Sequence, residues 1–111
     1  MNRIAMSPAA SALLRALVAR AGVPRDRILL TELRSTDWQS LTFVGERHRI
    51  HLRVPGPGSA LAIERMCDDL EEAEFGISDH IVADIAVVER PTTACDGSIS
   101  IMIEALTLAS D

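Results

Sequence analysis

The chain has 111 residues, of which 48% are hydrophobic and 24% charged, and its net charge is −5. These proportions are typical of a folded globular domain, and they exclude a disordered or fibrous chain. No stretch approaches the roughly 20 consecutive apolar residues that span a bilayer, so we expect one domain over residues 1–111 with no membrane partner.

The two cysteines, Cys67 and Cys95, lie 28 positions apart, with no CxxC motif and no pair of histidines beside them. This pattern predicts neither a disulfide framework nor a zinc site. Reduced thiols are typical of the cytosol, so we expect a cytoplasmic protein. We expect no metal and no other cofactor.

Charge is divided between the two halves of the chain. Residues 1–54 hold nine arginines and four carboxylates, a net charge of +5, whereas residues 55–111 hold two arginines and twelve carboxylates, a net charge of −10. A folded molecule with this division has a cationic side and an anionic side. The division limits what the molecule can bind, but it identifies no ligand.

A first helix is predicted to begin at Ser7 and Pro8, because serine can cap a helix and proline at its first position loses no hydrogen bond. Glycine at position 22 predicts its end. Between them, apolar residues recur at three- and four-residue spacing, namely Leu13, Leu14, Leu17, Val18 and Ala21.

Strands follow this helix. Aliphatic and β-branched residues over 28–35 predict one strand, and residues 38–44 and 47–54 flank Gly45 and Glu46, which predict a tight hairpin turn. Whether the first half contains two or three strands remains open in this pattern.

The second half repeats the order. Ser59 is expected to cap a second helix that ends before Gly76, with an apolar stripe formed by Leu61, Ala62, Met66, Leu70 and Ala73. Segments 80–90 and 98–108 then flank Asp96 and Gly97, a strong hairpin signal. Ile99, Ile101 and Ile103 alternate with serines, which is typical of a half-buried strand.

The element order is therefore α-β-β-α-β-β, made of two αββ units at residues 7–54 and 59–108 that suggest a duplication. Moving the first strand of a β-α-β-β-α-β split sandwich to its end gives the same order. We predict an α+β two-layer sandwich with an antiparallel sheet, both helices on one face and pseudo-twofold symmetry, a permuted ferredoxin-like arrangement.

Arg47, Arg49, His51 and Arg53 alternate along one predicted strand, so their side chains point to the same side of the sheet. Guanidinium groups at this spacing can bind phosphates or carboxylates, so these four residues are the candidate ligand-binding site for an anion. The alternative is an ordinary solvated face, with cross-strand pairs to residues such as Glu104.

The face that carries these residues is also partly apolar. If Ile81, Ile85 and Val87 point towards the helices, the opposite set contains Val82, Ala86, Val88, Met102, Leu106 and Leu108. Exposed apolar sheet faces are usually covered. A second copy would place its cationic half on the anionic half of the first, which favours a homodimer. The alternative is a register shifted by one residue, which would make this set the core.

His48 and His51 are three positions apart and face opposite sides of a strand, which argues against a metal site. No nucleophile, acid/base or nucleotide-binding motif is present. We therefore expect a small, non-catalytic interaction or ligand-binding domain that homodimerises through its open sheet face. Two alternatives are anion or nucleic-acid binding by the Arg/His strand, and an enzyme with His51 at a dimer cleft. The acidic half and the shortage of aromatic residues disfavour nucleic acid.

Overall fold

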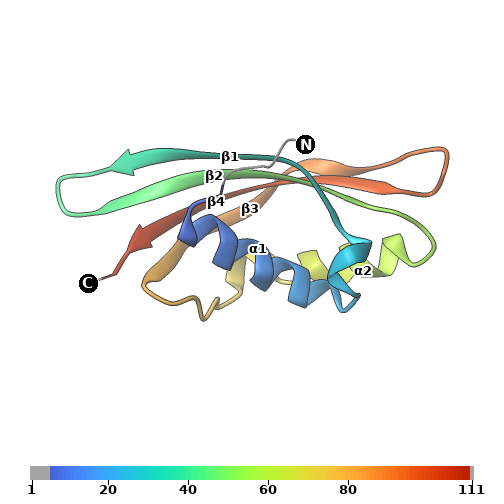
Figure 1. The fold of residues 1–111 in the computed structure, drawn as a ribbon, viewed down its shortest axis with the longest axis horizontal. Coiled ribbons are helices and arrows are strands. Elements are labelled where there is room, and N and C mark those ends of the chain that lie inside the picture. The colour runs from blue at the N-terminus through green and yellow to red at the C-terminus, as the bar shows by residue number, and fades with distance from the viewer. Residues whose placement is uncertain (1–5, 111) are drawn as a thin grey trace.

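Four antiparallel strands and two helices form two layers in the computed structural model, which describes residues 6–110 (Figure 1). The strand order is β1-β2-β4-β3, and every neighbouring pair is antiparallel. The predicted α+β two-layer architecture is confirmed, and the strand order is compatible with the permuted ferredoxin-like arrangement. The elements are α1 (Pro8–Ala21), β1 (Leu29–Gln39), β2 (Val44–Val54), α2 (Ser59–Cys67), β3 (His80–Thr93) and β4 (Ile99–Ala109), with short 3-10 helices at Arg25–Arg27 and Leu70–Glu72.

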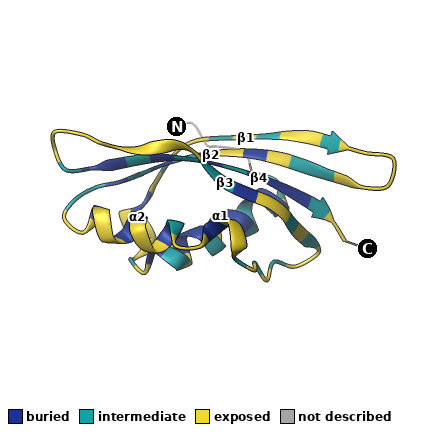
Figure 2. Ribbon diagram, turned by 180° about the vertical axis from the view of Figure 1, so that it is seen from behind, coloured by how far each residue is buried: buried dark blue, intermediate teal, exposed yellow. Residues whose placement is uncertain are grey.

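Both helices of residues 6–110 lie on one side of the sheet, which we call the inner face (Figure 1). The other side, which no helix of this part of the chain covers, is the outer face. Seen from behind, the helices turn exposed residues away from the sheet (Figure 2). Within the described residues, neither helix combines the length and the apolar content needed to cross a membrane.

Helix α1 forms as its sequence predicts. The side chain of Ser7 accepts a hydrogen bond of 3.1 Å from the backbone N–H of Ala10, and Pro8 begins the helix. Gly22 ends it with a φ of 72°, a left-handed conformation that glycine adopts without steric cost.

The predicted turn at Gly45 and Glu46 is wrong, because both residues lie inside β2. The hairpin turns instead at Ser40–Phe43, where the Ser40 hydroxyl accepts a 3.0 Å hydrogen bond from the N–H of Phe43. Gly45 serves a different need: a Cβ at this position would lie 2.0 Å from the carbonyl oxygen of Thr107 on β4. The first half therefore contains two long strands rather than three.

Helix α2 is shorter than predicted and ends at Cys67 rather than before Gly76. Five carboxylates follow closely, and negative charge at a helix C-terminus opposes the helix dipole. Arg20 of α1 donates a 3.1 Å hydrogen bond to the carbonyl of Met66 and a second bond to the carbonyl of Asp68, which satisfies free carbonyls at this end. The carboxylates are Asp68, Asp69, Glu71, Glu72 and Glu74.

Ser59 does not cap α2. Gly58 occupies the cap position, with a φ of 87°, and Ser59 is the first helical residue. The Ser59 hydroxyl donates a 2.8 Å hydrogen bond to the carbonyl of Gly97 in the β3–β4 turn. The bond therefore ties the start of α2 to the second hairpin.

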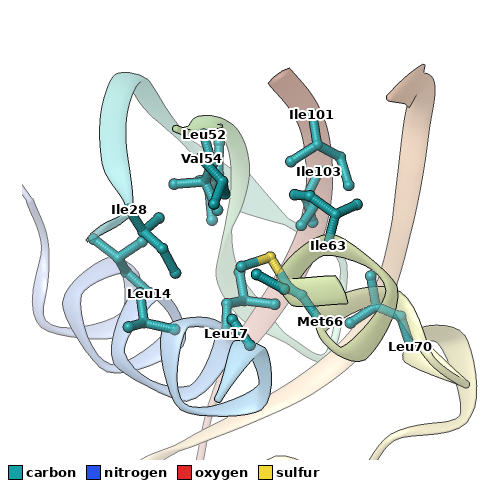
Figure 3. Packing of buried hydrophobic residues seen from close by; sticks show 14 of the residues in the cluster. Leu14, Leu17, Ile28, Leu52, Val54, Ile63, Met66, Leu70, Ile101 and Ile103 are labelled. Carbon is teal, nitrogen blue, oxygen red and sulfur yellow. The ribbon is translucent and has the colours of Figure 1, made fainter. Parts of the chain in front are cut away.

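The core lies between the inner face and the two helices. Ile50 opposes Ile103, and Leu52 opposes Ile101, in the β2–β4 register, and each of the four is at most 1% exposed. Figure 3 shows side chains of both helices converging on these strands. The labelled side chains from α1 are Leu14 and Leu17, those from α2 are Ile63 and Met66, and those from the strands are Leu52, Val54, Ile101 and Ile103.

The alternation predicted for β3 holds for Ile85 and Val87 but is reversed at its start. Val82 packs against the core, whereas Ile81 is 54% exposed and pairs with Leu108 on the outer face. The register shifts between Val82 and Asp84, so one extra residue reverses the inward and outward positions before it.

Replacing Ile103, which is 0% exposed, by alanine should lower the free energy of unfolding by about 2–5 kcal/mol, because it leaves a cavity between the layers. The matched control is Val88→Ala on β3, a 43% exposed residue, which should cost less than about 1 kcal/mol. Denaturant unfolding followed by circular dichroism at one protein concentration measures both. Equal losses would contradict this placement of the core.

Candidate interaction surface on the outer face of the sheet

The outer face carries five cross-strand rows, because opposed residues of antiparallel strands point to the same side. The rows run across β1, β2, β4 and β3, starting at the end near the β3–β4 turn. In order they are Leu29-Arg53-Ser100-Thr92, Glu32-His51-Met102-Glu89, Arg34-Arg49-Glu104-Ala86, Thr36-Arg47-Leu106-Asp84 and Trp38-Gly45-Leu108-Ile81.

These rows separate charge across the sheet. Their β1 and β2 positions hold four arginines and one glutamate, a net charge of +3, whereas their β4 and β3 positions hold two glutamates and one aspartate, a net charge of −3. The division between the two halves of the sequence therefore becomes a division between the two halves of one surface.

Arg53 is paired within the chain at the end of the outer face. Its guanidinium donates a 2.8 Å hydrogen bond to Asp96 and a 3.1 Å bond to the hydroxyl of Ser98. Hydrogen bonds from the Ser98 hydroxyl and N–H, together with the charge of Arg53, lower the pKa of Asp96. Arg53 thus ties the β3–β4 turn to β2 and already has a carboxylate partner.

Arg47 and Arg49 are less engaged. Arg49 lies 3.8 Å from Glu104, a long ion pair between half-exposed side chains, and Arg47 has no carboxylate partner within residues 6–110. Arg34 on β1 stands directly opposite Arg49. The structure therefore brings Arg34, Arg47 and Arg49 together and leaves Arg53 apart, and we call these three the arginine cluster.

The sequence pattern did not indicate Arg34, because its partner across β1 and β2 depends on the hairpin register. Its position in β1 sets it on the outer face, but only the hairpin register fixed by the Ser40–Phe43 turn sets it opposite Arg49. Two like charges directly opposed on a sheet repel each other. Glu104, 3.8 Å from Arg49, offsets this repulsion in part.

His51 is held by β1. Its Nδ1 contacts the Thr31 hydroxyl, and that hydroxyl lies 3.0 Å from the carbonyl oxygen of His51. Thr31 sits where the β1–β2 register shifts by one residue. The bulge therefore places a side chain that fixes the imidazole ring at the cationic edge of the outer face.

The last row is mostly apolar. Trp38, Leu108 and Ile81 lie in it, beside Leu106 of the preceding row. Leu106 is 9% exposed and Ile81 54% exposed. We call these four residues the apolar end of the outer face. Hydrophobicity therefore varies along the strands, whereas charge varies across them.

A second group of polar residues lies on the inner face, at the end near the β1–β2 turn. Asp37 opposes Glu46, and they line a hollow of about 240 Å³ together with His80 and Thr107. Two carboxylates that stand opposite each other on neighbouring strands repel each other. Sequence alternation gave no sign of this group because its members come from all four strands.

His48 lies beside this hollow and is 0% exposed. Its ring nitrogens make 2.8 Å hydrogen bonds with the hydroxyls of Ser35 and Thr107. Burial lowers the pKa of His48, although the nearby Glu46 acts in the opposite direction. A neutral, fully hydrogen-bonded ring is the result, on the side of β2 opposite His51.

Within residues 6–110, no group of three or more histidine, cysteine, aspartate or glutamate side chains is placed to hold a metal ion. Cys67 and Cys95 are both free thiols. Burial raises the pKa of Cys67, which keeps it protonated.

Scans of protein-family models, curated proteins and solved structures gave no significant match to this chain. The function proposed for this chain therefore rests on the residues of the outer face.

Protonation of His48 should make the fold sensitive to acid. Because burial holds its folded pKa below the ordinary 6.5, the unfolded chain takes up the proton first as the pH falls. The stability present above that value is lost as the pH falls through it towards the lowered folded pKa. His48→Gln, which cannot titrate, should lose less unfolding free energy between about pH 7 and 5. Superimposable pH profiles for the two proteins would refute this role.

Proposed function

We propose that this chain is a small non-catalytic interaction module that forms a homodimer through the outer face of its sheet. The observation that supports it most is the self-complementary surface, with arginines on β1 and β2 and carboxylates on β4 and β3. Such a surface attracts a second copy of itself and fixes how the copies meet.

Apolar content supports the same proposal. Trp38, Met102 and Leu108 are half-buried on the outer face, and Ile81 is largely exposed. No helix of residues 6–110 covers them. Exposure of this apolar area to water is unfavourable. Covering it stabilises the dimer by roughly 25 cal/mol for each Å² removed from water.

The size of the face also suits a dimer. Four strands about 4.8 Å apart, each about 36 Å long, present roughly 700 Å² on one face. A standard interface buries about 800 Å² on each partner. The outer face alone is therefore close to the area that a specific dimer requires.

Light scattering after size exclusion should give about twice the 12.0 kDa mass of the chain. Leu108→Asp places a charge in the apolar end, and we expect it to yield monomers. Leu61→Asp is the matched control, because Leu61 is 50% exposed on α2 in the other layer, and this variant should remain dimeric. A native protein that is monomeric at every concentration and salt level would remove the proposal.

A second candidate, binding of an anionic ligand, is favoured by the arginine cluster. Arg34 and Arg49 oppose each other, and Arg47 has no carboxylate partner within residues 6–110. Three guanidinium groups on a rigid sheet can share one polyanion. A carboxylate of a partner copy and a free anion would compete for the same donors.

Tripolyphosphate titrated by calorimetry tests this candidate. Arg47→Ala should weaken binding about 10- to 100-fold, since a hydrogen bond to a charged group contributes about 1.5–3 kcal/mol. Arg15→Ala serves as control, because Arg15 is exposed on α1, in the helix layer, where its guanidinium donates a hydrogen bond to Ser11. Heat of binding that is absent, or equal in the two variants, would reject the candidate.

A further inference from the structure

Building on the proposed homodimer, we infer that its twofold axis runs nearly parallel to the strands and passes between β2 and β4. This orientation lays β2 of one copy over β4 of the other, and β1 over β3. The charge gradient on the outer face selects this axis, and the position of the apolar end favours it.

The charge gradient runs across the strands. A strand-parallel axis places the β1–β2 half, with a net charge of +3, over the β4–β3 half of the partner, with a net charge of −3. An axis across the strands would place each half over its own copy, so +3 would meet +3. Like charges facing each other across an interface cost several kcal/mol.

The hydrophobic gradient runs along the strands. A strand-parallel axis keeps every row over the same row of the partner, so Trp38 meets Ile81 of the partner subunit at the apolar end. An axis across the strands would instead lay this end over the row Leu29-Arg53-Ser100-Thr92, in which only Leu29 is a large apolar residue. The strand-parallel axis therefore gathers the apolar ends of both copies in one place, whereas the crossing axis sets Leu108 and Ile81 against Ser100 and Thr92 of the partner subunit.

Known packing of sheets agrees with this choice. Face-to-face sheets commonly align their strands within about 30°. A twofold axis at half that angle, about 15° from the strand direction, produces such an alignment. The inferred axis therefore belongs to a common packing class.

One pair of oppositely charged residues can form a contact between two copies but forms none within a single chain. Arg47 and Asp84 lie in the same row, but β4 separates them, and no ion pair joins them. Across the inferred interface, Arg47 lies over Leu106 of the partner subunit, one strand away from Asp84 of the partner subunit, which the long arginine side chain can reach. Two such contacts form in each dimer.

Mixing two charge-reversal variants tests the axis. Arg47→Asp and Asp84→Arg should each raise the dissociation constant about tenfold or more, because two attractive contacts become repulsive. An equal mixture should form heterodimers whose dissociation constant lies within about threefold of the native value, since both contacts again join opposite charges. Sedimentation equilibrium measures all three samples, and the double variant should dimerise like the native protein.

Each outcome decides a different point. A monomeric native protein ends both the proposed function and this inference. A native dimer that Leu108→Asp disrupts, but in which the charge variants act as native or are not rescued by mixing, keeps the outer-face dimer and overturns the axis.

A distance measurement covers the case in which a single charge variant fails to fold. Spin labels on Thr92→Cys, with Cys67 and Cys95 changed to serine, should lie about 20 Å apart for the strand-parallel axis and about 30 Å apart for the crossing axis, from strand and sheet spacings. The shorter distance supports the inference and the longer one overturns it.

Discussion

The pairing of β2 with β4 is the constraint on which the rest of the structure depends. It joins the two αββ segments, and it places Ile50 opposite Ile103 in the core while Arg49 stands opposite Glu104 on the outer face. A slip of one residue would exchange the two sets and bury the arginines. One register therefore fixes the core, the charged surface and the side on which the helices pack.

Much of the fold could be predicted from sequence because the signals are local and mutually consistent. Alternation in Ile99, Ile101 and Ile103 identifies β4, and serine, proline and glycine mark the ends of α1. Predictions failed where the role of a residue depends on a contact with a residue far away in the sequence. Gly45 looks like a turn residue but is required by the close approach of β4, and α2 ends where Arg20 of α1 meets its carbonyls.

The candidate surface could be predicted only in part, for the same reason. Alternation along β2 places Arg47, Arg49, His51 and Arg53 on one face, but it does not reveal what each meets. Arg53 binds Asp96, which lies in a turn 43 positions away in the sequence. Arg34 joins the arginine cluster because the register of the β1–β2 hairpin sets it opposite Arg49. Properties of single strands follow from sequence, whereas properties of pairs of strands require the sheet.

The irregularities of β3 have a consequence for how sheets can grow. This edge strand departs from regular pairing at three places and contains Pro91, which has no N–H to offer a neighbour, whereas β1 is regular from Glu32 to Gln39. A further strand could therefore pair with the β1 edge, whereas the irregular β3 edge obstructs such pairing. Two molecules joined at their β1 edges would expose only blocked edges, so fibre-like extension would stop at a pair.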